Sequence, residues 1–510
     1  MANRVKPVGV ALLMAMGFLG EALAGAKYYV APAGDDANAG SQSMPFASMA
    51  KGQSVAVGGD TVFFRGGNYA ISSSTAEIAI TLSNSGSAGN RIHYFAYPGE
   101  VPVFDFKGMT ALKRIKGLLV TGSWLHIKGI EMKNVPQSDA NKAHEDWCVY
   151  VDGGSNNIFE ALNLHHNMGP GFFIQNGGNN LVLNCDSHDN YDPYSYAKTT
   201  LSTGEIVYTL TPGENADGFG CHVKATTGSG NVFRGCRAWF NADDGWDFIN
   251  CLASVTVENC WSWGNGYKSG TNPPQATGNG NGFKLGGFGN PPAGVPDPVP
   301  QHTVRFCLAF NNLAAGFYQN HHPIANFYYN NTSFNNKAAN YNLLGYNNGD
   351  ASLGILRNNI AFTGKDLSNN TLGGGVDAAN NSWNLSSLTV SSADFAGIDT
   401  AGVYAPRKSD GSLPAISFMQ LKTGSDLIDK GVDVKLAFNG KSPDLGAFES
   451  GTPTVILNGR KPRASLVASQ AIDIGGYDAR GRRMRTFLPG PGHHRAGGTV
   501  LLIPETGPKN

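Results

Sequence analysis

The sequence predicts an all-β protein, and within that class a parallel β-helix, in which short strands stack in successive coils of a solenoid. Composition is the first reason: of 510 residues, 67 are Gly and 48 are Asn, and both types are poor helix formers. The second reason is a repeat of Cys and Asn at fixed spacing, and the third is a repeat of Gly followed by an aromatic residue. Repeats with a period of 20 to 50 residues are typical of solenoids.

Composition also excludes several classes of protein. The glycines show no three-residue period, which excludes collagen, and 41% hydrophobic with 10% aromatic residues argues for a large core and against disorder. Lys plus Arg equals Asp plus Glu, 38 against 38, so charge gives no reason to expect a nucleic acid as partner. We expect a monomer that binds no nucleic acid.

The first 24 residues predict a signal peptide. Arg4 and Lys6 form a basic start, residues 8–19 are apolar, and Ala22-Leu23-Ala24 is a small-residue cleavage site. Glu21 interrupts the apolar run, which is shorter than the roughly 20 residues that a membrane helix needs. The mature protein is therefore expected to be secreted, to the medium or to the periplasm, without a membrane span.

A β-helix domain over residues 25–450 is expected to follow, with a cap at each end. Residues 27–30 and 60–64 are short apolar-rich runs, and Gly66-Gly67 is a turn signal, so the first strands and the N-terminal cap are expected there.

Cys and Asn define the coils in the middle of the chain. Each of four cysteines is followed five residues later by an asparagine: Cys185 by Asn190, Cys236 by Asn241, Cys260 by Asn265, and Cys307 by Asn312. The 24 residues from Cys236 to Cys260 are interpreted as one coil, and the spacings of 51 and 47 on either side as two coils each. Stacked Asn side chains can hydrogen-bond along the ladder, and stacked Cys side chains act as small hydrophobes. Seven Cys is an odd number, and this spacing favours a core role over a disulfide scaffold.

The Gly-aromatic repeat predicts a second set of stacked strands. It recurs as Gly171-Phe172, Gly218-Phe219, Gly245-Trp246, Gly282-Phe283 and Gly316-Phe317. Residues 352–450 are less regular and are expected to hold the last coils and the C-terminal cap. Residues 451–510 carry nine Lys or Arg against three Asp or Glu. Residues 477–483 in this tail resemble the C-terminal β-sandwich tails that some bacteria use for sorting, and a flexible basic tail is the alternative.

The candidate site appears when three segments are placed in register: Asn215–Cys221, Asn241–Phe248 and Asn279–Leu285. In each segment the aromatic residue and the residue two positions later are apolar. Because side chains alternate along a strand, these two face the core and the residue between them faces outward. The outward residues are Gly220, Asp247 and Lys284, so Asp247 and Lys284 are expected on adjacent strands.

Four carboxylates converge in this alignment. Asp217 and Asp244 both precede the repeated glycine and should stack, while Asp243 and Asp247 lie on the same coil as Asp244. Like charges this close are costly unless a cation or a proton compensates them. Oxygen ligands in this number suit Ca²⁺, whereas zinc prefers His and Cys. A Ca²⁺ that only joins two coils, or a solvated acidic turn, are the alternatives.

Lys284 suggests the chemistry. A lysine beside a bound divalent cation has its charged form disfavoured and its pKa lowered, so it can act as a general base. The alternative is a salt bridge to Asp247. The reaction that needs both groups is β-elimination on a uronate, in which the base removes the C5 proton and a cation stabilises the negative charge that develops.

These motifs resemble the family-9 polysaccharide lyases, secreted bacterial pectate lyases with a right-handed parallel β-helix. The resemblance covers residues 27–449 and implies a Ca²⁺-dependent pectate lyase that acts on polygalacturonate. It places the four Ca²⁺-binding aspartates at Asp217, Asp243, Asp244 and Asp247, with the backbone carbonyl of Phe248 as a further ligand. It places the catalytic base at Lys284, within Gly-Phe-Lys-Leu-Gly-Gly. The Pro-rich loop at 268–277 departs from the family pattern and is expected to shape the groove.

Three alternatives stay open. Relatives in the family act on other acidic polymers such as rhamnogalacturonan. A hydrolase on the same fold could use Asp243 and Asp244 as a carboxylate pair, although it would not need Lys284. A non-catalytic carbohydrate-binding solenoid would use the metal only structurally. His222, Lys224, Arg237 and Lys268 are candidates for binding substrate carboxylates, and Tyr318 and Tyr341 are candidate exposed aromatics for stacking on sugars.

Overall fold

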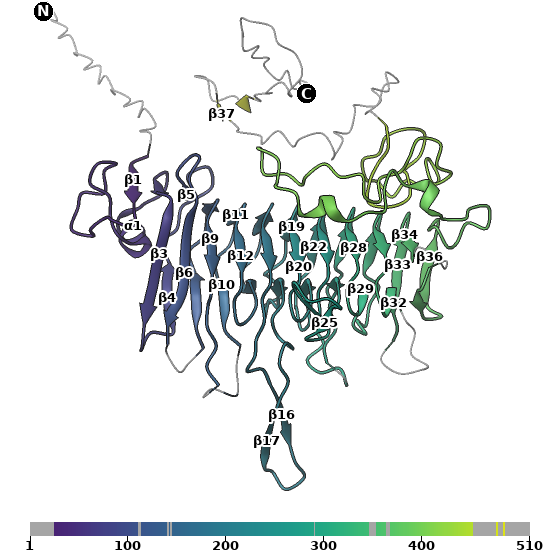
Figure 1. The fold of residues 1–510 in the computed structure, drawn as a ribbon, viewed down its shortest axis with the longest axis horizontal. Coiled ribbons are helices and arrows are strands. Elements are labelled where there is room, and N and C mark those ends of the chain that lie inside the picture. The colour runs from purple at the N-terminus through teal and green to yellow at the C-terminus, as the bar shows by residue number, and fades with distance from the viewer. Residues whose placement is uncertain are drawn as a thin grey trace, which may run out of the picture.

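The chain winds into stacked coils, and three long parallel sheets run along the molecule (Figure 1). The computed structural model describes residues 25–451 except 111–113, 140–141, 143–144, 290, 346–352 and 364–367, together with the backbone of two short strands at 476–477 and 483–484. The prediction of a parallel β-helix is confirmed. The predicted signal peptide lies outside the described residues, as does most of the predicted tail. Within the described part of the chain, no helix has the length and apolar character needed to cross a membrane.

Sheet A forms one side of the solenoid, and each coil contributes one strand to it. Its neighbours pair in parallel, as in Leu181↔Val232 and Val232↔Thr256. In order along the sheet, the strands are β1 Lys27–Val30, β2 Thr61–Phe64, β5 Ile92–Ala96, β8 Leu125–Lys128, β11 Ile158–Glu160, β14 Leu181–Leu183, β19 Asn231–Arg234, β22 Val255–Glu258, β27 Thr303–Arg305, β30 Phe327–Tyr329, β33 Gly354–Arg357 and β36 Val376–Ala379.

Sheet B follows sheet A in each coil after a short bend. Its strands are mostly three residues long, with the middle residue buried, as at Leu164 and Ser187. In order, the strands are β3 Gly67–Ser73, β6 Pro102–Met109, β9 Glu131–Lys133, β12 Asn163–His165, β15 Asp186–His188, β20 Arg237–Trp239, β23 Trp261–Trp263, β28 Leu308–Phe310, β31 Thr332–Phe334 and β34 Ile360–Phe362.

Sheet C completes the coil and carries the Gly-aromatic repeat. In order, its strands are β4 Ile78–Leu82, β7 Lys116–Val120, β10 Trp147–Asp152, β13 Phe172–Asn176, β18 Phe219–Cys221, β21 Trp246–Asp247, β26 Phe283–Lys284, β29 Ala315–Tyr318, β32 Ala339–Leu343 and β35 Thr371–Leu372. The inward aromatic rings of this sheet stack, with centroids 4.9 Å apart for Phe219 and Trp246 and 4.6 Å apart for Trp246 and Phe283. The stack continues through Phe317 to Tyr341, which is fully buried. The expectation that Tyr341 is exposed is therefore wrong.

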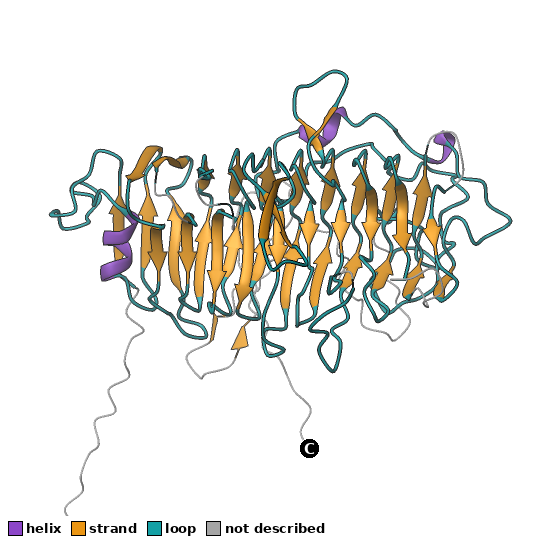
Figure 2. Cartoon of the chain, turned by 90° about the horizontal axis from the view of Figure 1, so that it is seen from below, coloured by secondary structure: helices purple, strands orange, loops and turns teal. Residues whose placement is uncertain are grey.

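A few elements lie outside the three sheets. The helix α1 (Met49–Val55), which the sequence analysis did not predict, lies at the N-terminal end of the solenoid (Figure 2). Its first turn is capped by the Ser48 side chain, which accepts a hydrogen bond from the Lys51 N–H. The remaining elements are the hairpins β16–β17 (Tyr196–Thr200, Ile206–Leu210) and β24–β25 (Tyr267–Lys268, Gln275–Ala276), the pair β37–β38 (Gly476–Tyr477, Arg483–Met484), and the 3₁₀ turns η1 (Ser392–Asp394) and η2 (Ala401–Tyr404).

The predicted ladders are present at the bends. Six asparagines are linked side chain to side chain, with Nδ2 to Oδ1 distances of 2.8–3.1 Å: Asn167, Asn190, Asn241, Asn265, Asn312 and Asn336. We call this set the asparagine ladder. The cysteines that precede it are buried and unpaired, and the Cys236 N–H points to Cys260 Sγ at 3.3 Å. Both predicted roles are confirmed.

The interpretation of the longer spacings as two coils is wrong. Asn190 bonds directly to Asn241, and the Cys260 N–H reaches Cys307 Sγ, so both pairs occupy neighbouring coils. The extra residues form insertions instead. One contains the hairpin β16–β17, which projects from the body of the solenoid (Figure 1), and the other contains β24–β25.

The chain after the last coil returns along the outer face of sheet B. There Phe395, Phe418 and Leu445 pack on outward side chains of β23, β28, β31 and β34 and form a second apolar core. Asp186 on β15 fixes the same segment, because its carboxylate binds Arg407 at 2.6 Å and Arg237 at 2.7 Å. Arg237 therefore joins two parts of the fold, and its guanidinium is occupied.

Candidate active site

The outer face of sheet C brings the candidate residues together. Strand register places Gly220, Asp247, Lys284 and Tyr318 side by side on β18, β21, β26 and β29. The residues before and after them on each strand, such as Phe219 and Cys221 around Gly220, are buried in the core. Because side chains alternate along a strand, the residues of the row must face outward. The predicted adjacency of Asp247 and Lys284 is confirmed.

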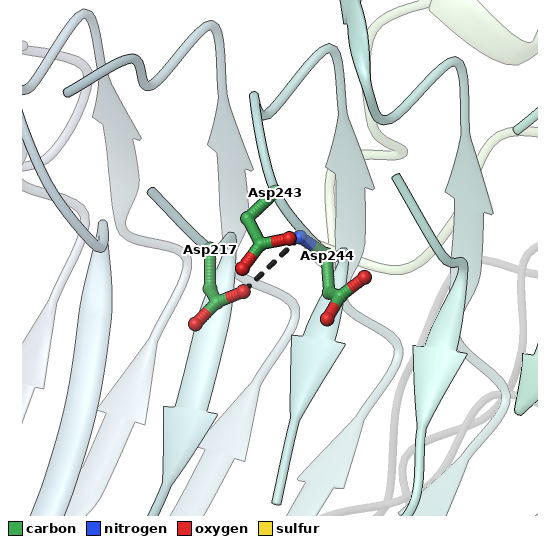
Figure 3. Close-up of side chains that lie close together, drawn as sticks. All are labelled: Asp217, Asp243 and Asp244. Carbon is green, nitrogen blue, oxygen red and sulfur yellow. Dashed lines mark hydrogen bonds between the residues drawn. The ribbon is translucent and has the colours of Figure 1, made fainter. Parts of the chain in front are cut away.

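Three aspartates form a buried cluster where β18 and β21 begin (Figure 3). One carboxylate oxygen from each of Asp217, Asp243 and Asp244 lies within 4.8 Å of the other two. The Asp244 N–H donates to Asp217 Oδ1 at 3.1 Å, the dashed line in Figure 3, which locks the two coils in register. Asn281 on the next coil donates its backbone N–H and its Nδ2 to Asp244 Oδ1 at 2.7 and 2.8 Å.

The cluster is electrostatically strained. Burial raises the pKa of the Asp217 and Asp243 carboxyls well above the ordinary value, and the neighbouring carboxylates raise both further. Burial also raises the pKa of Asp244, although Lys284 opposes that shift. Asp243 Oδ1 is buried and accepts no hydrogen bond. The three side chains therefore favour a proton or a cation at this place.

Lys284 lies next to the cluster, with its side chain only 13% exposed. Its Nζ is 3.0 Å from Asp247 Oδ2, with which it forms a hydrogen bond, and 3.1 Å from Asp244 Oδ2, an ion contact without hydrogen-bond geometry. Burial acts to lower the pKa of Lys284, but the attraction of Asp244, Asp247, Asp243 and Asp217 outweighs it and leaves that pKa well above its usual value. The four carboxylates therefore favour the protonated form of the amine.

Asp247, the fourth predicted carboxylate, is not a member of the three-aspartate group. Asp247 points Oδ2 at Lys284, and its Oδ1 accepts the Ile249 N–H at 2.7 Å. The Phe248 ring is in the core, and its carbonyl accepts the Cys251 N–H at 3.2 Å. A carbonyl has a second lone pair, so this bond leaves it one further acceptor position.

The structure adds Phe173 and places the sequence candidate His222 against it, beside the row on its N-terminal side. Register pairs Phe173 with Gly220, and a Cβ at Gly220 would meet Phe173 Cδ2 at 2.5 Å, so the ring occupies space that only glycine leaves open. The His222 ring packs on Phe173 at 4.6 Å, and its Nε2 lies 3.9 Å from Asp247 Oδ2. Burial lowers the pKa of His222 to about 4, so the ring is neutral near pH 7. The glycine between two inward residues was the available signal for this contact in the sequence.

The arrangement can do two things chemically. It can hold a hard cation between carboxylates that repel one another, and it offers an amine that can take up a proton beside that position. Tyr318, on the far side of Lys284, is partly buried, and burial raises the pKa of its hydroxyl, so it acts as a neutral hydrogen-bonding group.

Comparison with known proteins agrees with the β-helical fold. Residues 28–359 match the family described as "Pel9A-like, right handed beta helix region". A pectate lyase L of Dickeya chrysanthemi is 35% identical over 427 residues, which cover 83% of this chain and 90% of that protein. The solved structure of a rhamnogalacturonan lyase matches with a TM-score of 0.68 and 34% identity, over 79% of this chain and 98% of that one. The crystal structure of pectate lyase Pel9A matches with a TM-score of 0.67 and 31% identity, over 83% and 96%.

Proposed function

The chain belongs to the Pel9A-like family of right-handed β-helices, and from that premise we propose that it is a Ca²⁺-dependent pectate lyase, which cleaves polygalacturonate by β-elimination. It is a polysaccharide lyase, because relatives named as pectate lyases match it over most of both chains. One observation carries the finer proposal: the amine of Lys284 contacts Asp244 and Asp247 beside the aspartate cluster.

The aspartate cluster fits Ca²⁺. Two oxygens that bind one Ca²⁺ at about 2.4 Å can lie up to about 4.8 Å apart, and the oxygens of Asp217, Asp243 and Asp244 satisfy that limit. The unpartnered Asp243 Oδ1 supports the same assignment. Asp247 and the Phe248 carbonyl complete the proposed ligand set. When bound, Ca²⁺ supplies positive charge that stabilises the anion next to the uronate carboxylate and offsets the carboxylates that hold the proton on Lys284.

Lys284 is the proposed catalytic base. Its neutral amine takes the proton from C5 of a uronate, the C–H electron pair becomes the C4–C5 double bond, and the C4–O bond to the leaving sugar breaks. The leaving oxygen takes a proton from solvent. Asp247 positions the amine through the 3.0 Å contact. Because the carboxylates raise the pKa of Lys284, the neutral amine becomes more abundant as pH rises, and an alkaline optimum is expected.

Export completes the proposal. Residues 1–24 act as a signal peptide, residues 25–450 form the lyase domain, and residues 451–510 form a basic tail. An extracellular polymer as substrate supports secretion, and a mature N-terminus at Gly25, found by mass spectrometry of the secreted protein, would verify the cleavage site.

The test follows the unsaturated product. The protein is incubated with polygalacturonate, with Ca²⁺ or with a chelator, and ultraviolet absorbance of the double bond is recorded. Absorbance should rise with Ca²⁺ and stop with the chelator. Lys284→Ala should abolish turnover, and so should Lys284→Arg, which keeps the positive charge but is never neutral near the working pH. Full activity of either variant would refute the role of Lys284, and reducing ends without absorbance would indicate hydrolysis.

Rhamnogalacturonan is the second candidate substrate. The rhamnogalacturonan lyase structure supports it, since it matches this chain as well as the pectate lyase structure does. The same absorbance assay with the two polymers side by side decides between them.

A further inference from the structure

A second groove runs along the bend between sheets B and C, apart from the candidate active site. It consists of two hollows of about 880 and 490 Å³, and both are lined by Phe240 and Tyr267, where they meet. None of the clustered aspartates lines either hollow, and neither does Lys284. The groove therefore shares no aspartate and no lysine with the proposed cleavage site, and the smaller hollow ends beside that site at Ala242, the residue before Asp243.

The floor of the groove is a row of residues in the left-handed conformation. Asp189, Phe240, Gly264, Asn311 and Asn335 each follow a sheet B strand, with φ between 51° and 62°. Five successive coils contribute one residue each, so the row spans four strand spacings, or about 19 Å. A groove of this length along the solenoid axis suits an extended chain better than a small molecule.

Other segments supply the walls. The hairpin β24–β25 contributes Tyr267 and Lys268, and the returning C-terminal segment contributes Tyr404. The Tyr404 residue is 52% exposed, and its ring stands edge-on to Trp263 at a centroid distance of 5.5 Å. The loop at 268–277, which was expected to shape the groove, is part of this hairpin.

The side chains that line the groove are suited to bind an acidic carbohydrate. The rings of Tyr267 and Tyr404 offer flat apolar faces for sugar rings, with polar groups beside them, as ligand sites commonly do. The side-chain amides of Asn311 and Asn335 can donate to and accept from hydroxyls. Lys268 and Lys337 add positive charge, whereas the single carboxylate in the lining, on Asp189, is already engaged by His188 Nδ1 at 2.6 Å.

We propose that this groove is a second polysaccharide-binding site, which holds an acidic polymer chain away from the point of cleavage. The identity of that polymer as polygalacturonate rests on the proposed function. Holding one part of a long polymer raises the effective concentration of the rest at the active site. The groove thus keeps the enzyme bound to the polymer, while the site on sheet C cleaves it.

The test measures binding in the absence of turnover. The Lys284→Ala chain is run by affinity electrophoresis through gels that contain polygalacturonate, with chelator present to suppress binding through Ca²⁺. Lys337→Ala/Tyr404→Ala is added in the groove, and Lys27→Ala/Tyr29→Ala serves as the matched control, with the same residue types on β1 at the far end of the solenoid. Both groove residues are exposed, so the fold should survive their loss; thermal melting verifies this.

The groove variant should bind about tenfold more weakly than the control, which corresponds to about 1.4 kcal/mol. Equal retardation of the two variants would overturn the proposal. If the Lys284→Ala chain were retarded as strongly in gels of a neutral galactan as in gels of polygalacturonate, the proposal that the ligand is acidic would be overturned. Failure of the proposed function is separately visible, because the unsubstituted chain would then give no unsaturated product whatever the gels show.

Discussion

The asparagine ladder should stabilise the solenoid strongly, and Asn265→Ala tests this at its centre. Asn265 is fully buried. Its Oδ1 accepts the backbone N–H and Nδ2 of Asn241, both at 3.1 Å, and its Nδ2 donates to Ser262 Oγ and Asn312 Oδ1, both at 2.9 Å. Alanine removes all four hydrogen bonds.

The magnitude follows from what each partner retains. Asn241 Nδ2 keeps a bond to the Ser187 carbonyl, and Asn312 Oδ1 keeps the backbone N–H of residue 265. The backbone N–H of Asn241, also fully buried, loses its acceptor. An unsatisfied buried N–H costs about 1–3 kcal/mol, and each of the other three lost bonds costs about 1 kcal/mol. The free energy of unfolding should therefore fall by about 4–6 kcal/mol.

The assay is equilibrium unfolding in urea, followed by tryptophan fluorescence, with m-values compared between variants. Asn68→Ala is the control, since Asn68 is an exposed asparagine on β3 and its loss should cost less than about 0.5 kcal/mol. A loss below about 1 kcal/mol for Asn265→Ala would refute the reasoning. The hydrogen bonds of the ladder would then stabilise the folded state no more than hydrogen bonds to water stabilise the unfolded state.

Three further predictions concern the buried carboxyl of Asp192 in the bend after β15, the aspartate cluster and the Phe173 ring. Burial raises the pKa of Asp192 to about 7 from 3.8, so the folded state holds this proton more tightly, and stability should fall as pH rises from about 4 to 7. Asp192→Asn should remove that fall and be more stable above pH 7 by up to about 4 kcal/mol in urea unfolding; identical pH profiles would contradict it. Ca²⁺ at about 100 times its Kd should add about 2.7 kcal/mol of stability, seen as a higher Tm that chelator reverses and Asp243→Asn lacks; an unchanged wild-type Tm would exclude an ion at the cluster. Gly220→Ala should displace the Phe173 ring, destabilise the fold by about 1–3 kcal/mol and lower kcat/KM, whereas unchanged kinetics would show that the ring plays no part in binding.

The ladders were predictable because a solenoid repeats the same contact in sequence and in space. Cys236 and Cys260 are one coil apart, so their stacking follows from spacing alone. The insertions were interpreted as complete coils because 51 and 47 residues are close to twice the coil length. A spacing alone does not distinguish an additional coil from a loop inserted between two neighbouring coils. The hydrogen bond from Asn190 to Asn241 decided the matter.

The site was predictable in part. Alternation along the strands placed Lys284 beside Asp247, and the structure agrees. The sequence predicted a lowered pKa for Lys284 beside a bound cation, whereas the four carboxylates by themselves raise that pKa. Tyr341 was expected to be exposed because sequence alternation gives a period but not which of its two phases faces the core.

By itself, the sequence determined the β-helix, the coil positions of Asn and Cys, and the row that joins Asp247 to Lys284, because these depend on contacts that recur at short, regular separations along the chain. Only the tertiary structure decided where residues 380–451, which follow the last coil strand, lie and what they build. Arg407 reaches Asp186 across 221 residues, and Tyr404 meets Trp263 to wall the second groove. Such contacts join a repeating element to a non-repeating one, so no period in the sequence records them.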